Sequence, residues 1–275
     1  MGTSDFMKKK LRNRSRAEIA GMLFLLAAIA AYFIHPLFTI VLLLFYIVLC
    51  VVACFFPQIN FLGQVVSQGR SGKDYVAVTF DDGPSEPITR QILDLLDKYH
   101  VQATFFVTGV AALRHPEIIS DIVARGHSIG NHSYSHNPFV MTKPYQTLYR
   151  EVCEAQNVLR KMGIQALAFR PPVGIINPKL PSILEALGLF CVTFNCRALD
   201  AGNRRVKNLA ARILKKIKAD AIILLHDVPA CPIEDNGILL QEIEKILMEI
   251  MNKGMRIVPL AALIGRDVMI CAPRQ

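Results

Sequence analysis

The sequence predicts an α/β domain of parallel strands and helices, preceded by a membrane segment of two helices. Two observations predict this fold class. After residue 74, short runs of β-branched and aromatic residues alternate with longer amphipathic runs. Before it, a nearly uncharged apolar stretch occupies residues 17–56. Strand–helix alternation implies parallel strand pairing, and an apolar stretch of this length indicates a bilayer.

A basic cluster occupies the first segment, residues 1–16. Its members are Lys8, Lys9, Lys10, Arg12, Arg14 and Arg16. Such a cluster stays on the cytoplasmic side of a membrane and attracts anionic lipid. It contributes much of the formal net charge of +9, and no basic patch is interleaved with stacking aromatics as a nucleic-acid platform requires. We therefore expect a lipid bilayer as a partner and no nucleic acid.

The apolar stretch is too long for one span, which needs about 20 residues. Because His35-Pro36 lies near its middle, we expect a helical hairpin with arms at residues 17–34 and 37–56. The alternative is one span with an interfacial extension. A cleavable signal peptide fits poorly, because its apolar core is far shorter and a small-residue cleavage site would follow it.

The expected location is the cell membrane, in a bacterium the cytoplasmic membrane. Two spans would return the following domain to the cytoplasm, whereas one span would leave it outside. The seven cysteines have no C-x-x-C spacing, which favours a reducing compartment or buried free thiols. The side on which the domain lies stays open at this stage.

Residues 57–73 predict a linker because glycine recurs at Gly63, Gly69 and Gly72. Residues 74–275 then form the predicted domain. Its expected strands are residues 75–80, 103–108, 127–130, 167–170, 190–195, 221–225 and 256–258. Its expected helices are residues 88–99, 116–125, 142–163, 179–187, 206–218 and 236–252. Ser85 and Pro87 are the expected N-cap and first-turn residues of the first helix.

The alternation alone leaves a barrel and a doubly wound sheet open. Both architectures place catalytic groups at the C-terminal ends of the strands. At the first such end, Asp81 and Asp82 follow an apolar strand and precede Gly83-Pro84. Adjacent carboxylates repel each other unless a cation or a basic partner compensates. An Asp-Gly turn that caps a helix and a phosphatase-type aspartate nucleophile are the alternative interpretations.

Two histidines, His132 and His136, follow the third predicted strand. Four residues apart, they would lie on one face if the segment made a helical turn, as two ligands of one ion must. The Ser and Asn content of the segment predicts a loop or a single turn. Together with Asp82 they supply three ligands and leave a position open for water or substrate, as in a catalytic metal site. Asp81 would then be free to act as a base. Taken alone, the pair is equally compatible with surface histidines.

Two further polar groups stand at later strand ends. Arg170 precedes a rigid Pro-Pro turn, where a guanidinium can hold a carboxylate in its ionised form. His226 ends the sixth predicted strand, where it could be a general acid. The alternative for His226 is a strand-end histidine bonded to Asp227.

Four motifs resemble those of the NodB-type polysaccharide deacetylases, also called carbohydrate esterase family four. They are Thr79-Phe80-Asp81-Asp82-Gly83-Pro84, the stretch 126–136, Arg170-Pro171-Pro172-Val173-Gly174 and Leu224-Leu225-His226-Asp227. They occur in the family's order within residues 74–263. The resemblance implies a distorted (β/α)7 barrel and a divalent metal, usually zinc, with cobalt, manganese or nickel as alternatives.

The resemblance also implies a role for each matching residue. The implied metal ligands are Asp82, His132 and His136. The implied catalytic residues are Asp81 as base, Arg170 as the group that orients it, His226 as acid and Asp200 as the acid that tunes His226. The implied substrate-binding residues are Pro171, Val173 and Leu225, the last lining a pocket for the acyl methyl. Ala201 and Val173 depart from a frequent tryptophan and tyrosine, which affects the substrate pocket and not the metal chemistry.

The implied function is metal-dependent hydrolysis of the N-acetyl group of an amino sugar in a cell-envelope polysaccharide, peptidoglycan or chitin-like. The alternative is a deacetylase or deformylase of a lipid-linked amino sugar at the cytoplasmic membrane face. A non-catalytic sugar-binding protein on the same fold is a hypothesis from another class. The presence of both Asp81 and His226 argues against it.

Overall fold

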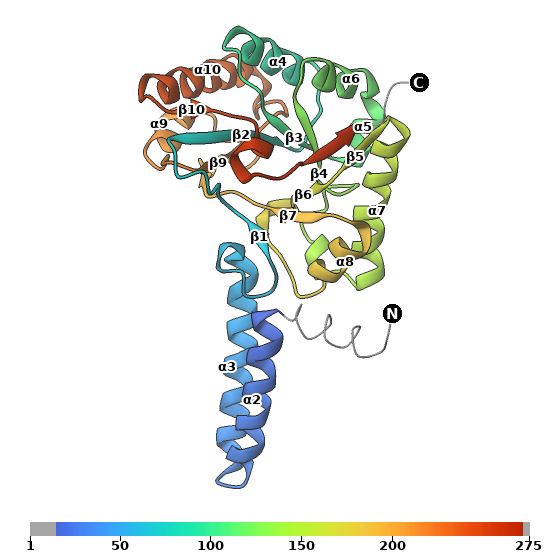
Figure 1. The fold of residues 1–275 in the computed structure, drawn as a ribbon, viewed down its shortest axis with the longest axis vertical. Helices are drawn as coiled ribbons and strands as arrows, with labels where there is room; N and C mark the ends of the chain where they lie inside the picture. The colour runs from blue at the N-terminus through green and yellow to red at the C-terminus, as the bar shows by residue number, and fades with distance from the viewer. Residues whose placement is uncertain (1–14, 272–275) are drawn as a thin grey trace.

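The computed structural model describes residues 15–271. Most of the predicted basic N-terminus, residues 1–14, therefore lies outside the described residues. Two helices, α2 (Arg16–Tyr32) and α3 (Pro36–Phe55), lie side by side and project from an α/β domain (Figure 1). The hydroxyl of Tyr46 donates to the carbonyl of Ala17 at 2.9 Å, which ties the two helices together.

The ends of these helices follow from their sequence. Ser15 and Glu18 form a reciprocal capping box at the start of α2, and proline occupies the first turn of α3. Within residues 15–271, α3 is the one helix that is long and apolar enough to cross a membrane, judged by length and composition. At 17 residues α2 is shorter. A transmembrane hairpin therefore stays a prediction.

The domain is built on a parallel sheet. Along its path the strands are β1 (Val65–Val66), β7 (Phe190–Val192), β6 (Ala168–Phe169), β4 (Ser128–Asn131), β3 (Thr104–Val107), β2 (Tyr75–Asp81), β9 (Ala221–His226) and β8 (Cys196–Arg197). β10 (Arg256–Ile257) pairs in parallel with β2. A separate antiparallel pair joins β5 (Ile164–Ala166) to β11 (Met269–Cys271).

The parallel strands of the expected barrel are present, and the sheet curls into a half-barrel. Over the described residues, the path begins at β1 and ends at β8, and these two strands do not pair with each other. The sheet is therefore open rather than a closed ring. The predicted strand at residues 190–195 ends earlier in the structure, because β7 stops at Val192. A separate strand, β8, begins at Cys196 and lies at the far end of the path.

Helices surround the sheet (Figure 1). They are α4 (Ile88–Lys98), α5 (Gly109–Arg114), α6 (Pro116–Ala124), α7 (Tyr145–Lys161), α8 (Leu180–Leu187), α9 (Leu209–Leu214), α10 (Asn236–Asn252) and α11 (Leu260–Ile264). The expected cap of α4 is wrong. Pro87 is the cap residue, and the Ser85 hydroxyl instead donates to the carbonyl of Asp227 at 2.5 Å.

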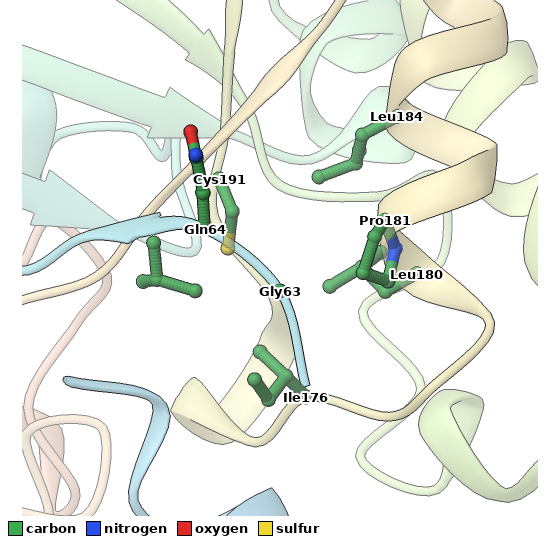
Figure 2. Close-up of a pocket in the computed structure, with 8 residues that line it drawn as sticks. Gly63, Gln64, Ile176, Leu180, Pro181, Leu184 and Cys191 are labelled. Atoms are coloured by element: carbon green, nitrogen blue, oxygen red, sulfur yellow. The ribbon is translucent and has the colours of Figure 1, made fainter. Parts of the chain in front are cut away.

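The base of the helix pair is packed into the domain. The amide of Ala17 donates to the carbonyl of Phe61 at 2.9 Å, and the amide of Ile176 donates to the carbonyl of Cys54, in α3, at 3.1 Å. Ala17, Ala53 and Ile176 belong to one buried apolar cluster. A small apolar cavity lies beside it, between the predicted linker and α8, and contains none of the predicted site residues (Figure 2).

Candidate metal centre and active site

The predicted site residues gather at the C-terminal edge of the sheet. Asp81 is the last residue of β2 and stands in register with His226, the last residue of β9. His132 directly follows β4, and Arg170 directly follows β6. Because these strands are parallel neighbours or near neighbours in the sheet, their carboxyl ends meet at one edge.

Asp82, His132 and His136 form a compact cluster of three possible metal ligands. Oδ1 of Asp82 lies 3.2 Å from Nε2 of His132 and 2.9 Å from Nε2 of His136. One ligand atom from each residue lies within 4.8 Å of the others. The spacing of the three residues thus matches a site for one ion bound by two nitrogens and one oxygen.

The two histidines reach this geometry in a loop, one of the two forms predicted for the segment, and not in a helical turn. The segment between them is a loop in which Ser133 and His136 have positive φ values of 67° and 53°. Asp82 has a φ of 81°. Non-glycine residues in this region are strained and cluster at functional sites.

The hydrogen bond of His132 indicates whether a cation fits between the three ligand residues. Its Nδ1 lies 2.7 Å from the backbone carbonyl of Arg170. A carbonyl only accepts, so Nδ1 carries the proton and Nε2 presents its lone pair to the Asp82 carboxylate. Two acceptors face each other here, and either a second proton or a cation must lie between them. A divalent cation such as zinc fits this donor set, and cobalt, manganese and nickel share its preference for imidazole and carboxylate.

The electrostatics of the cluster favour positive charge. Burial opposes ionisation of Asp82, but hydrogen bonds from His132 and His136 outweigh it and hold its pKa well below the usual range. Burial likewise opposes protonation of His132, but the charges of Asp81 and Asp82 outweigh it and raise its pKa. A bound cation would take the place of that extra proton.

Asp81 and Arg170 form an ion pair beneath the cluster. Arg170 is fully buried at 0% exposure, and its Nη1 donates to Oδ1 of Asp81 at 2.6 Å and to the hydroxyl of Thr79 at 2.7 Å. Its Nη2 donates to the carbonyl of Thr193 at 3.1 Å. The guanidinium carbon also lies 3.9 Å above the ring of Phe106. The other carboxylate oxygen of Asp81 lies 3.8 Å from Nε2 of His132, next to the three ligands.

His226 forms a second polar pair on the other side of the cluster. Its Nδ1–H donates to Oδ2 of Asp200 at 2.7 Å, and its Nε2 lies 4.0 Å from Oδ2 of Asp82. Burial opposes protonation of His226, but its hydrogen bond to Asp200 outweighs it and raises the pKa of the imidazole to about 9. The same bond lowers the pKa of Asp200. The alternative interpretation, a strand-end histidine bonded to Asp227, is wrong, because the imidazole bonds to Asp200.

The predicted substrate-binding residues lie around this site. Pro171 is buried directly after Arg170. Val173 is 51% exposed, with a φ of 62°, in the short helix η3 (Pro172–Gly174). Leu225 precedes His226 on β9 and is 1% exposed, within the main apolar core. Their contacts with a substrate stay predictions.

Sequence reasoning considered Asp227 only as a partner of His226, whereas the structure shows that Asp227 holds the Asp81-Asp82-Gly83 turn. One of its carboxylate oxygens accepts the amide of Gly83 at 2.9 Å, and the other accepts the hydroxyl of Thr89 at 2.9 Å. Burial raises the pKa of Asp227 to about 7. No local sequence pattern predicts this contact, because it joins residues that are 144 positions apart.

Thr79 was also missed, although a signal exists. Side chains alternate along a strand, so Thr79 and Asp81 lie on the same face of β2 and can meet the same partner. The structure brings both to Nη1 of Arg170. Asn203 is a third missed residue, whose side chain donates to the backbone carbonyl of His226 at 3.1 Å.

The sequence of this chain is similar to those of known deacetylases. Residues 68–192 match the family described as polysaccharide deacetylase. A peptidoglycan-N-acetylglucosamine deacetylase of Bacillus cereus is 30% identical over 204 residues, which are 74% of this chain and 93% of that protein. A chitooligosaccharide deacetylase of Bradyrhizobium is 35% identical over 159 residues, which are 57% of this chain and 72% of that protein.

The fold is similar to that of a solved relative. The crystal structure of a peptidoglycan N-acetylglucosamine deacetylase, in complex with 4-naphthalen-1-yl-N-oxidanyl-benzamide, aligns with a TM-score of 0.65. It is 29% identical in sequence, and the alignment covers 74% of this chain and 94% of that one.

Proposed function

Because the chain belongs to the polysaccharide deacetylase family, whose members are hydrolases that act on carbon–nitrogen bonds, we propose that it removes the N-acetyl group from an amino sugar of a cell-envelope glycan by metal-dependent hydrolysis. Peptidoglycan and chitin-like chains are the substrates named for its relatives. One observation carries the proposal. The cluster of Asp82, His132 and His136 lies between two polar pairs. These are the buried Asp81–Arg170 pair and the His226–Asp200 pair.

The three ligand residues define where the chemistry takes place. A divalent cation held by Asp82, His132 and His136 would polarise the acyl oxygen and bring the pKa of a water molecule to about 7. We assign this cation as zinc, with cobalt, manganese or nickel as substitutes. Asp81 takes the proton of the attacking water, and Arg170 fixes the orientation of that carboxylate.

The remaining residues complete the hydrolysis. The oxygen of the water forms a bond to the acyl carbon, and the amide N–H of the Val173 turn is proposed to stabilise the oxyanion. His226 then donates its Nε2 proton to the sugar nitrogen as the carbon–nitrogen bond breaks, while Asp200 holds the imidazole through Nδ1. The products are acetate and a free amino sugar.

Acetate release from three substrates tests the proposal. The full chain loaded with zinc is given chitooligosaccharide, purified peptidoglycan, and an N-acetylated amino sugar linked to lipid in vesicles. We expect acetate release from at least one, and its loss on chelation. Release from none of them, despite bound zinc, would contradict the proposal and favour a non-catalytic sugar-binding protein.

A lipid-linked amino sugar is the second candidate substrate, for deacetylation or deformylation, and a specific contact favours it. Val140 and Met141, which follow His136, share a buried cluster with Ala17 and Ala53 in the helix pair. The segment after Arg170 also joins α3, through the amide of Ile176. If both helices cross the bilayer, the site opens near the membrane face from which α2 starts.

The topology of the chain separates the two substrates. Two spans would put the site on the cytoplasmic side, together with the basic N-terminus, and would favour the lipid-linked sugar. One span would put it outside, where a wall polymer is the substrate. Alkaline phosphatase fused after Gln275 is active only outside, whereas a fluorescent cytoplasmic reporter at the same position reports the inside.

A further inference from the structure

A strongly basic loop borders the metal centre. We call residues 197–207, from the last residue of β8 to the approach to α9, the basic loop. Its basic side chains are all exposed, and they are Arg197, Arg204, Arg205 and Lys207. Within the described part of the chain, none of them lies within salt-bridge distance of a carboxylate. The proposed deacetylation does not use these four charges.

The interior of the loop is fixed against the site. Asp200 accepts from Nδ1 of His226 at 2.7 Å, and the side chain of Asn203 donates to the carbonyls of His226 and Val228 at 3.1 and 2.7 Å. A Cβ atom added to Gly202 would lie 3.8 Å from Oδ2 of Asp82. The backbone of the loop therefore runs beside the ligand cluster.

Two of the basic side chains, Arg204 and Arg205, follow this contact directly. Arg205 is three residues beyond Gly202, and three residues span at most roughly 11 Å even when extended. The amide of Arg205 also donates to the carbonyl of Asp200 at 3.0 Å, which keeps the loop folded back on the site. The guanidinium groups of Arg204 and Arg205 are thus within reach of a sugar whose acyl group lies at Asp82.

The charges near the loop do not cancel it. Asp200 is buried and occupied by His226. The short helix η4 (Ile233–Asp235) carries the carboxylates of Glu234 and Asp235. The segment before η4 contacts the basic loop, because the amide of Cys231 donates to the carbonyl of Asn203 at 3.1 Å. On the basic loop and η4 together, four basic side chains therefore outnumber the two carboxylates of Glu234 and Asp235. A neutral chitin-like chain offers them no partner, whereas guanidinium groups match phosphate in geometry and charge.

We propose that the basic loop binds a phosphoryl group carried by the substrate, next to the sugar whose N-acyl group is hydrolysed. This inference rests on the proposed deacetylase function and narrows its substrate class to a phosphate-linked amino sugar. The phosphoryl group can belong to a lipid-phosphate sugar in the bilayer or to a soluble nucleoside diphosphate sugar. The two sources share the same recognition chemistry.

Steady-state kinetics of the full chain tests the assignment. The variant Arg204→Gln/Arg205→Gln is compared with wild type on a neutral chitooligosaccharide, a nucleoside diphosphate N-acetylglucosamine, and N-acetylglucosamine linked through phosphate to a polyisoprenol in vesicles. We expect the KM for the phosphate-bearing substrates to rise at least tenfold more than the KM for the neutral one. The phosphate-bearing substrate with the larger wild-type kcat/KM identifies the source of the phosphoryl group.

The matched control is Arg160→Gln/Lys161→Gln, which removes two exposed charges at the end of α7. It should leave all three KM values as in wild type. Equal KM changes for neutral and phosphate-bearing substrates in the loop variant would overturn the assignment. Acetate release from the neutral substrate by wild type reports the deacetylase function separately.

Binding of inorganic pyrophosphate measures the loop without turnover. Calorimetry on chelator-treated protein should show a dissociation constant at least tenfold weaker in the loop variant than in wild type and in the control. Identical affinities in all three proteins would overturn the assignment, even if none of them released acetate.

Discussion

Asp81 and Arg170 form a buried ion pair across the ends of β2 and β6, with 2.6 Å between Oδ1 and Nη1. The pair fixes one carboxylate oxygen and leaves the other facing the Asp82–His132 contact. A base must be held within reach of the proton it removes, and this pairing does so without occupying the second oxygen. The arrangement separates the ligand, Asp82, from the base, Asp81.

Replacing the base should leave the cation in place. Asp81→Asn keeps the size of the side chain and removes its proton-accepting charge, so we expect acetate release to fall by about 10²- to 10⁴-fold. Zinc content, measured by mass spectrometry, should match wild type. The control Asp94→Asn changes an exposed carboxylate that pairs with Arg125. A variant at position 81 with wild-type turnover would contradict the role of the base.

Removing the partner of Asp81 should destabilise the fold. Arg170→Gln leaves a buried carboxylate without its cation, which costs about 3–5 kcal/mol. The matched control Arg125→Gln removes a partly exposed guanidinium that pairs with two exposed carboxylates and should cost about 0–1 kcal/mol. Urea unfolding followed by circular dichroism compares the two. Equal losses of unfolding free energy would be inconsistent with the buried pair.

The His226–Asp200 pair predicts a pH dependence of stability. The folded pKa of His226, about 9, lies above its ordinary value near 6.5. The stabilisation is therefore fully present below pH 6.5 and is lost as the pH rises through about 9. In chelator-treated protein, we expect Asp200→Asn to lose more unfolding free energy at pH 6 than at pH 10. A loss that does not change with pH would show that the pair is not charged.

The close approach of Gly83 to Asp227 gives a steric prediction. A Cβ atom at this position would overlap the Asp227 carboxylate that accepts the Gly83 amide. We expect Gly83→Ala to destabilise the protein by about 1–3 kcal/mol and to lower zinc affinity, because Asp82 adjoins the displaced turn. Gly237→Ala in α10, where a Cβ meets nothing, is the control. Thermal unfolding and zinc titration measure both effects.

The sequence predicted most strand ends of the site well because a local change from apolar to polar residues marks them. Asp81, Arg170 and His226 directly follow apolar runs, whereas His132 follows the short strand Ser128–Asn131. Parallel strands bring such ends to one edge. The α10 helix was predicted with its observed bounds for a similar reason. Its apolar face repeats at helical spacing along residues 236–252.

Other features could not be predicted because they depend on contacts distant in sequence. β1 lies inside the predicted linker and is a strand only because its residues pair with β7. The left-handed backbone at Asp82 and His136, rather than a helical turn, brings the ligands together. The sheet is open because its two end strands, β1 and β8, do not pair with each other, and the apolar runs in the sequence do not reveal this.

The dependence of acetate release on the Asp82, His132 and His136 cluster tests the central claim most directly. Acetate is measured on the best substrate with zinc-loaded protein, chelator-treated protein, protein reloaded with zinc, and Asp82→Ala at matched zinc concentration. The account predicts activity that is lost on chelation, restored by zinc, and lost in Asp82→Ala under all conditions. Full, chelator-sensitive activity in Asp82→Ala would contradict it.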